Sequence, residues 1–279
     1  MANRSGEVLQ QRELASPFYK ELQVAKAAAL EAGSIIMEGF QKIHEARIKP
    51  DNSLVSDIDI SAEAKIHEII TTVFPNHAFW GEEGGKSHQE SPNLWIVDPL
   101  DGSHNFLQDI PIFTMSIAYV ENGELKVGVI HDPLHGELFW AEKGKGSFVN
   151  NESIHVSSEY EFSDTTVGFT RGPHKENKML LGRIYSTVGS EVRNTRILGS
   201  AALHFAYVAS GRFDALVNIG NHPWDFAAGI LLISEAGGKV TDLVGNELNF
   251  EKDKIIASNG IPTIHDPLIR IAKTQALDS

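Results

Sequence analysis

The most informative segment of the sequence is WIVDPLDGS, residues 95–103. Its first residues continue an apolar run from Leu94 and are typical of a short buried strand. The run ends directly in two acids, Asp98 and Asp101, which flank Pro99 and Leu100. Proline fixes its own backbone angle and stiffens the segment, so we expect both carboxylates to converge on one side. The stretch predicts a buried sheet with acidic side chains at its end.

Helices precede this strand and further strands follow it. A first helix is expected over residues 16–40, opened by Ser16 and Pro17, and a second over residues 56–74, stopped by Pro75. Apolar residues at helical spacing give each helix one buried face. Antiparallel strands are expected at residues 112–120, 125–130 and 137–141, the first two joined by a hairpin at residues 121–124.

Strands and helices alternate from about Thr165 onward. The sequence therefore predicts a layered α+β or α/β fold, with an antiparallel N-terminal sheet and an α/β C-terminal half. We expect the halves, residues 1–155 and 156–279, to meet without a flexible linker. The expected strands lie near residue 167 and at residues 192–198 and 213–218, and the expected helices at residues 178–188, 200–210 and 224–236.

Composition excludes several classes of protein. The chain has 279 residues, 24 Lys and Arg, 37 Asp and Glu, a net charge of −13 and no cysteine. Disulfides, thiolate zinc sites, iron–sulfur clusters and cysteine nucleophiles are thus absent. An acidic chain is poorly suited to binding nucleic acid. No apolar run is long enough for a membrane span, and the first 14 residues lack the apolar core of a signal peptide, so we expect a cytoplasmic protein.

Three acidic stretches stand where a fold would not place charge. They are residues 81–85 (GEEGG), residues 95–103 (WIVDPLDGS) and residues 223–229 (PWDFAAG). Taken singly, each has an ordinary explanation as a solvated loop, a turn or a helix cap. Taken together, with glycines beside each acid, they indicate one site. Buried carboxylates must either become neutral or surround a cation, and oxygen ligands alone select a hard cation such as Mg²⁺.

The chain resembles the inositol monophosphatase family of Mg²⁺-dependent, lithium-sensitive sugar phosphatases. The resemblance covers nearly the whole chain and rests on two motifs, WIVDPLDGSHNF at residues 95–106 and WDFAAG at residues 224–229, together with GEE at residues 81–83. It implies alternating αβαβα layers and a homodimer. It also implies two or three Mg²⁺ ions, with Mn²⁺ as a substitute and Li⁺ as an inhibitor.

The resemblance also implies a role for each matching residue. Glu82, Asp98 and the carbonyl of Leu100 would hold the first metal ion. Asp98, Asp101 and Asp225 would hold the second, and Glu82 would support a third through water. The resemblance thus assigns the ligands to three separate stretches of sequence.

Two further residues match catalytic positions of the family. Ser103 stands where the family usually has Thr, whose hydroxyl aligns the attacking water. Asp59 matches the acid that partners this hydroxyl. With Glu82 and Asp101, these residues form the expected catalytic set.

Substrate contacts are implied for the backbone of Gly102 and Ser103, which would receive phosphate, and for Ser200, Ala201 and Asp225 beside the sugar. Asn218 stands seven residues before Asp225, where many inositol phosphatases carry an acid that accepts inositol hydroxyls. Gln108 stands where a His is frequent. These two departures leave the preferred phosphate ester open.

The predicted activity is a Mg²⁺-dependent phosphomonoesterase that hydrolyses inositol monophosphate or a related sugar phosphate with metal-activated water. Alternative substrates are histidinol phosphate, fructose 1,6-bisphosphate and 3′-phosphoadenosine nucleotides. A different class of function is a non-catalytic, partner-binding role, for example with the transcription machinery.

Overall fold

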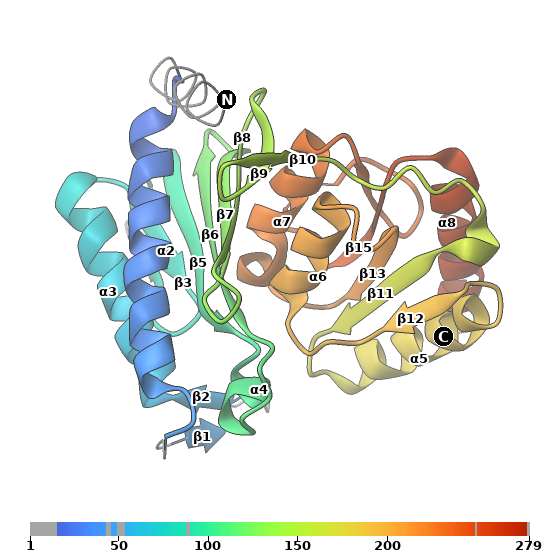
Figure 1. Ribbon diagram of the computed structural model, residues 1–279, viewed down its shortest axis with the longest axis horizontal. Coiled ribbons are helices and arrows are strands. Elements are labelled where there is room, and N and C mark those ends of the chain that lie inside the picture. The colour runs from blue at the N-terminus through green and yellow to red at the C-terminus, as the bar shows by residue number, and fades with distance from the viewer. Residues whose placement is uncertain (1–15, 43–45, 49–53, 88–89, 249, 278–279) are drawn as a thin grey trace.

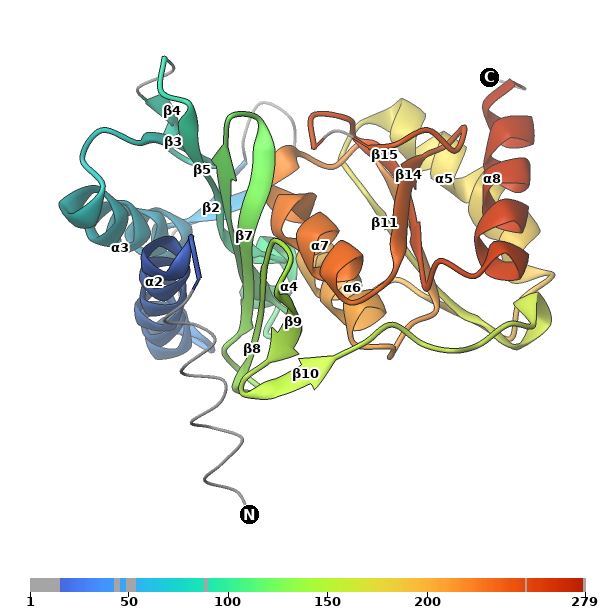
Figure 2. The same cartoon turned by 90° about the horizontal axis from the view of Figure 1, so that it is seen from above.

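Five layers of secondary structure stack in the order helix, sheet, helix, sheet, helix in the computed structural model (Figures 1 and 2). The structure describes residues 16–42, 46–48, 54–87, 90–248 and 250–277. In this part of the chain no helix is long and apolar enough to cross a membrane. The expectation drawn from the first 14 residues lies outside the described residues.

The first helical layer holds α2 (Tyr19–Gly39) and α3 (Asp57–Val73). The expected start of α2 is wrong by about two residues, because the Ser16 hydroxyl accepts from the N–H of Phe18 before the helix begins. The start of α3 is confirmed, since Ser56 is its N-cap and forms a capping box with Asp59. Both helices lie against one face of the larger sheet (Figure 2).

The larger sheet has eight strands in the order β10-β9-β8-β7-β6-β5-β3-β4. All neighbours are antiparallel except β3 and β5, which run parallel. The expected hairpin is confirmed: Asn122 and Gly123 both have positive φ, as a two-residue type I′ turn requires. The strands are β3 (Ala78–Gly81), β4 (Gly85–Ser87), β5 (Asn93–Asp101), β6 (Thr114–Glu121), β7 (Glu124–Asp132), β8 (Glu137–Glu142), β9 (Gly146–Val149) and β10 (Glu152–Ile154).

The second sheet has five strands in the order β12-β11-β13-β15-β14, and only β11 with its two neighbours is parallel. Its strands are β11 (Thr166–Arg171), β12 (Asn194–Arg196), β13 (Ala215–Ile219), β14 (Lys239–Asp242) and β15 (Lys254–Ser258). The outer helices are α5 (Lys175–Gly189) and α8 (Pro262–Leu277). Short elements complete the fold: β1 (Ala46–Ile48), β2 (Leu54–Ser56), α4 (Ser103–Leu107) and the 3₁₀ turn η1 (Phe162–Asp164).

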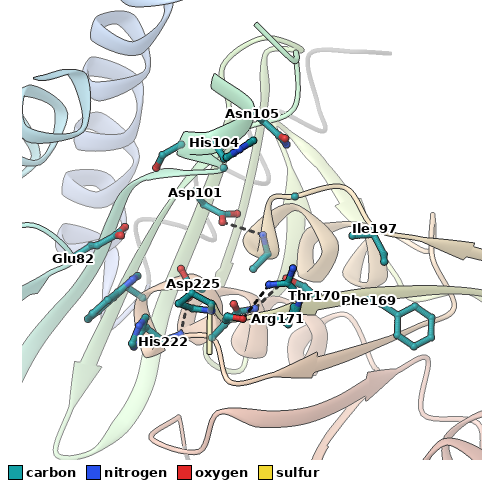
Figure 3. Close-up of a pocket in the computed structure, with 18 of the residues that line it drawn as sticks. Glu82, Asp101, His104, Asn105, Phe169, Thr170, Arg171, Ile197, His222 and Asp225 are labelled. Atoms are coloured by element: carbon teal, nitrogen blue, oxygen red, sulfur yellow. Dashed lines mark hydrogen bonds between the residues drawn. The ribbon is translucent and has the colours of Figure 1, made fainter. Parts of the chain in front are cut away.

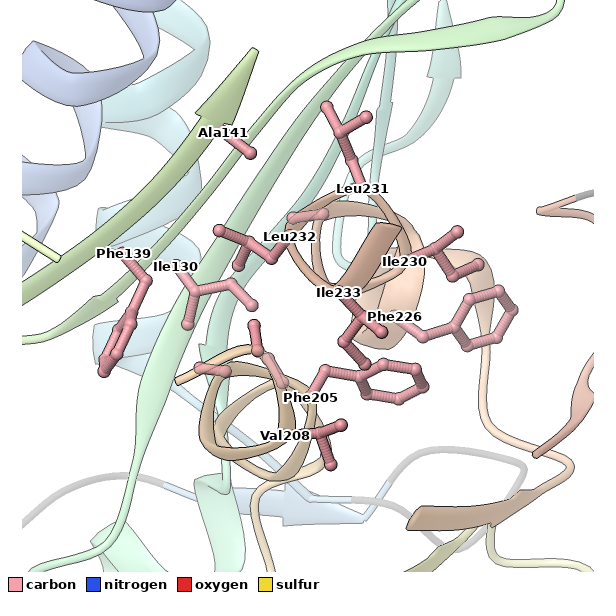
Figure 4. Packing of buried hydrophobic residues seen from close by; sticks show 14 of the residues in the cluster. Ile130, Phe139, Ala141, Phe205, Val208, Phe226, Ile230, Leu231, Leu232 and Ile233 are labelled. Atoms are coloured by element: carbon pink, nitrogen blue, oxygen red, sulfur yellow. The ribbon is translucent and has the colours of Figure 1, made fainter. Parts of the chain in front are cut away.

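Two helices between the sheets, α6 (Ala201–Ala209) and α7 (Pro223–Glu235), form the central layer. Both are apolar nearly all round, as a helix buried on all sides must be. Phe205 and Phe226 lie side by side between the helices, and Leu232 points toward Ile130 and Phe139 of the larger sheet (Figure 4). The starts of α6 and α7 both reach the end of β5, which creates the site.

Candidate active site

The two acids of the central motif converge because of a β-bulge. Asp98 pairs with Ser116 of β6 but Asp101 pairs with Thr114, so β5 carries one extra residue between them. In a regular strand, side chains three residues apart point to opposite faces, whereas the extra residue returns both to one side. Pro99 suits the bulge because it has no N–H to donate to the ladder. The predicted convergence is confirmed, by a bulge rather than a turn.

A third carboxylate reaches the bulge from the central layer. Asp225 lies in the first turn of α7, where its Oδ2 accepts from the N–H of His222 at 2.7 Å. One carboxylate oxygen from each of Asp98, Asp101 and Asp225 lies within 4.8 Å of the other two. We call these three residues the acid cluster. Glu82 follows β3, and its backbone N–H donates to the carbonyl of Val97 at 3.1 Å, which fixes it beside β5.

The acid cluster is electrostatically unfavourable by itself. Burial raises the pKa of Asp98 well above its ordinary value, and the negative charge of Glu82 raises it further. Burial likewise raises the pKa of Asp225, with repulsion from Asp101 as the next cause. Carboxylates this close together are stable only if some of them are protonated or if a cation lies among them. The donor set is oxygen only, which fits a hard divalent cation.

Asp101 also joins the larger sheet to the central helical layer. Its carboxylate accepts from the N–H groups of Ala201 (3.0 Å) and Ala202 (2.7 Å) at the start of α6, and from the hydroxyl of Ser200 (2.5 Å). Burial raises the pKa of Asp101, while these hydrogen bonds act in the opposite direction. A carboxylate at a helix N-terminus is stabilised by the free N–H groups there. Asp101 is therefore a cap of α6 as well as a candidate ligand.

The Ser103 hydroxyl lies 2.9 Å from Asp59 Oδ1 and 2.9 Å from the carbonyl oxygen of Leu100. Asp59 is fully buried, and its other oxygen accepts from the N–H of Ser56 at 2.8 Å. The hydroxyl has one hydrogen, so only one of the two acceptors can take it at a time. Ser103 and Asp59 are 44 positions apart in sequence, and the fold brings them into contact, as the family resemblance implies.

A cavity of about 550 Å³ opens above the acid cluster. Of the residues predicted from sequence, Glu82, Asp101, Gly102, Ser103, Ala201 and Asp225 line it. Figure 3 shows Glu82 and Asp101 on one side of this cavity and Thr170, Arg171 and Ile197 on the other. A volume of this size is in the range that holds a whole small-molecule ligand.

The structure places two of the predicted substrate contacts away from the lining of the cavity. Ser200 is fully buried beneath Asp101 and does not line the cavity. Asn218 is also fully buried, since its Nδ2 donates to the carbonyl of Asp253 and its Oδ1 accepts from Asn221. It lies one hydrogen bond behind the cavity wall, and Asn221 takes the place at the wall itself. Gln108 is exposed and lies outside the lining residues.

Several residues at or beside the cavity escaped the sequence analysis. Thr170, Arg171 and Asn221 line it at the carboxyl ends of β11 and β13. Glu63 of α3 lies behind Glu82, where its carboxylate accepts from the N–H groups of Glu83 (2.8 Å) and Gly84 (2.6 Å). The first three had a signal, because ligands of α/β sheets bind outside the carboxyl ends of parallel strands. Glu63 had no such signal, because a single Glu on a helix is not distinctive in sequence.

Comparisons with known proteins agree with this geometry. Residues 19–276 match the model of the inositol monophosphatase family. A fructose-1,6-bisphosphatase/inositol-1-monophosphatase of Thermotoga maritima is 38% identical over 86% of this chain and 91% of its own length. The Nus factor SuhB of Pseudomonas aeruginosa is 36% identical over 85% of this chain and 91% of its own. The crystal structure of the extragenic suppressor protein suhB from Bartonella henselae superposes with a TM-score of 0.86 at 36% identity, over 91% of this chain and 98% of that one.

These matches confirm the family resemblance, the layered fold and the enzyme class, a phosphatase. On both sequence and structure, this chain belongs to the inositol monophosphatase family.

Proposed function

We propose that this chain is a Mg²⁺-dependent phosphomonoesterase that acts on inositol monophosphate or a related sugar phosphate. The observation that carries the proposal is the acid cluster, whose three carboxylates lie within 4.8 Å of one another at a cavity that also receives Ser103. Three buried like charges cost free energy unless a cation offsets them. A phosphatase is the family activity to which such a site belongs.

Asp98, Asp101 and Asp225, with Glu82 and the carbonyl of Leu100, would hold two or three Mg²⁺ ions. When bound, Mg²⁺ would offset the carboxylates and supply positive charge for the phosphate oxygens and for the activation of water. Mn²⁺ would substitute, and Li⁺ would inhibit by competing for the same oxygen atoms.

Ser103 and Asp59 would handle the proton of the attacking water. Asp59 would be the acceptor of the Ser103 hydrogen if the Leu100 carbonyl oxygen held a cation, since Ser103 Oγ lies 2.9 Å from Asp59 Oδ1. Ser103 Oγ would take a proton from the water and pass its own to Asp59. The water oxygen would bond to phosphorus while the ester bond breaks, and the departing alkoxide would take a proton from solvent. Gly102, at the start of α4, would place its backbone beside the phosphate.

Phosphate release from inositol 1-phosphate, with Mg²⁺ and with chelator, tests the proposal. We expect activity only with Mg²⁺, and a loss of about 10³-fold in Asp225→Asn, because this change removes a charge that no other residue replaces. Asp109→Asn, at an exposed position outside the cavity, is the matched control. Full activity of Asp225→Asn, or activity that survives chelation, would overturn the assignment.

The same assay decides among the alternative substrates. Histidinol phosphate, fructose 1,6-bisphosphate and 3′-phosphoadenosine 5′-phosphate should be compared with inositol 1-phosphate by kcat/KM. The division of the chain near residue 155, the homodimer and the cytoplasmic location stay predictions that accompany this proposal.

A second candidate is the partner-binding role that the sequence left open. It is favoured by the similarity to a protein named Nus factor SuhB. The two candidates are separable, because Asp225→Asn should abolish hydrolysis while leaving a partner-binding surface intact. A cell that needs this protein but is fully complemented by Asp225→Asn would favour the second candidate.

A further inference from the structure

Asn105 belongs to the motif at residues 95–106, but the proposed mechanism gives it no role. It lies in α4, two residues after Ser103, and it is buried although it borders the cavity (Figure 3). A buried amide group needs hydrogen bonds to offset the loss of its contact with water. The partners of Asn105 therefore show which parts of the chain it connects.

The Asn105 side chain joins two segments that are far apart in sequence. Its Nδ2 donates to the carbonyl of Ile112, seven residues on, and to the carbonyl of Leu198, 93 residues on, both at 2.8 Å. A carbonyl oxygen can only accept, so these two contacts fix which way the amide points. Both hydrogens of the NH₂ group are used. The side chain is thus a cross-link between the segment after α4 and the segment before α6.

The segment before α6 is part of the cavity wall. We call residues 197–199 the wall segment, and both of its ends line the cavity. The N–H of Leu198 donates to Nε2 of His204 at 3.3 Å, so both backbone polar groups of Leu198 are bound by side chains. Gly199 has a φ of +85°, and a Cβ atom there would lie 2.7 Å from Asn105 Nδ2. Only glycine allows the backbone to approach the amide this closely.

A second contact joins the same two parts of the chain. Asp101 accepts two backbone N–H groups at the start of α6, directly after the wall segment. Asp101 and Asn105 stand on either side of Gly102 and Ser103 in sequence. A Cβ atom at Gly102 would lie 3.4 Å from the carbonyl oxygen of Gly199, so the two segments are in contact between these hydrogen bonds. The backbone of Gly102 and Ser103 is therefore anchored at both of its ends.

From these contacts we infer that Asn105 is a positioning residue for substrate binding, which fixes the backbone of Gly102 and Ser103 relative to the wall segment. The inference rests on the proposed function, which places the phosphate at this backbone. Asn105 acts through the backbone and not by contact with the reacting atoms. The Ser103 hydroxyl is held separately by Asp59, so loss of the Asn105 amide should weaken substrate binding more than it slows the chemical step.

Asn105→Ala tests this inference, because it removes both hydrogen bonds of the amide. We expect a rise of about 10- to 100-fold in the KM of the ester that the unaltered protein hydrolyses best, and in the inhibition constant of inorganic phosphate. We expect kcat to stay within about fivefold, since the hydroxyl that orients the water keeps its partner. Asn105→Ser keeps one donor and should give a smaller rise in KM, about 3- to 10-fold. It takes the place of Asn105→Ala if that variant does not fold.

Asn259→Ala is the matched control. Asn259 is also buried, and its Nδ2 donates to the Ser157 hydroxyl (3.2 Å) and to the Glu159 carbonyl (2.8 Å). It therefore also links distant parts of the chain, but it lies outside the lining residues of the cavity. Its loss should lower the melting temperature and leave both KM and the inhibition constant of phosphate unchanged.

The outcomes separate this inference from the proposed function. If the unaltered protein releases no phosphate from any of the esters named above with Mg²⁺, the proposed function is overturned and the inference with it. If the protein is active but KM is unchanged in Asn105→Ala or, where that variant does not fold, in Asn105→Ser, only the inference is overturned. Equal rises in KM in Asn105→Ala and Asn259→Ala, or a fall in kcat without a rise in KM, would also overturn it.

Discussion

In the proposed mechanism, a single hydroxyl presents the attacking water to phosphorus. Ser103 has the hydroxyl of the more usual Thr but lacks its methyl group, and Asp59 fixes its direction at 2.9 Å. Asp59 is itself held by the N–H of Ser56, so the pair is rigid. The proposed mechanism therefore gives the proton transfer to this pair rather than to a histidine at the cavity.

Ser103→Ala should therefore lower kcat by about 10²- to 10⁴-fold, because it removes the group that orients the water and relays its proton. Ser103→Thr should stay within about tenfold of the unaltered protein, since the hydroxyl is restored. Steady-state phosphate release with Mg²⁺ measures both. The thermal shift that Mg²⁺ produces is the control, and we expect it to survive in Ser103→Ala. An Ala variant with unaltered kcat would remove Ser103 from the mechanism.

The turn that carries Glu82 is held in place by hydrogen bonds to α3. Glu63 is buried, and each of its oxygens accepts one backbone N–H of this turn. A Cβ atom at Gly81 would lie 2.4 Å from the Glu63 carboxylate, so the glycine makes room for the contact. These hydrogen bonds hold the turn beside β5, where Glu82 follows β3.

Glu63→Gln should weaken Mg²⁺ binding by about 10- to 100-fold, as changes behind a ligand typically do. An amide keeps one acceptor but sets its NH₂ group against a backbone N–H, which loosens the turn. Mg²⁺ titrations of activity and of melting temperature should both shift to higher concentration. Glu68→Gln, on the same helix but largely exposed, is the control. Equal Mg²⁺ affinity in the two variants would contradict the positioning role.

A buried histidine holds the segment before α6. The Ser200 carbonyl can only accept, so His204 carries its hydrogen on Nδ1 (2.6 Å), and its Nε2 accepts from the N–H of Leu198 (3.3 Å). Burial lowers the pKa of His204 to about 4 from 6.5. Between these pH values the unfolded chain binds a proton that the folded protein does not, so stability falls as pH falls.

His204→Gln should abolish this component of the pH dependence. The stability advantage of the unaltered protein over the variant should shrink by about 2–3 kcal/mol between pH 7 and pH 4.5. Urea unfolding of both proteins at each pH measures this change. The acid cluster is present in both, so subtracting the free energy of unfolding of His204→Gln from that of the unaltered protein cancels its contribution. Exposed His174→Gln should show no such change. A difference that is the same at both pH values would refute a neutral His204.

The sequence predicted the layers of the fold more fully than it predicted which distant residues contact one another. The alternating strands and helices after Thr165 and the antiparallel run before it predicted a layered α/β fold, because each pattern is local. The αβαβα order itself was implied by the family resemblance. The convergence of Asp98 and Asp101 was also foreseen, although its cause, a bulge, appears only when β5 is paired with β6. Asn218 was misplaced because its partners, Asp253 and Asn221, are set by how the strand ends meet. Arg171 stands at the carboxyl end of β11, and it was missed because its wall of the cavity forms only where β11 pairs with β13.

The spacing between the larger sheet and the central helices depends on one residue without a side chain. Gly128 of β7 lies against the backbone of α7, where an added Cβ would come 2.7 Å from the carbonyl oxygen and 3.1 Å from the Cα of Ala228. Since α7 also carries Asp225 in its first turn, the packing of these two layers sets the position of a candidate ligand.

Gly128→Ala should therefore destabilise the protein by about 1–3 kcal/mol, the usual cost of overpacking, and should also raise the Mg²⁺ concentration needed for half-maximal activity. Gly182→Ala is the matched control, because this exposed glycine of α5 has nothing within 4 Å of an added Cβ. There alanine should be neutral or stabilise the helix by up to about 1 kcal/mol. Urea unfolding and Mg²⁺ titration of both variants give the result. If Gly128→Ala were as stable as Gly182→Ala, α7 would not be fixed on the sheet at this point, and its hold on Asp225 would need another explanation.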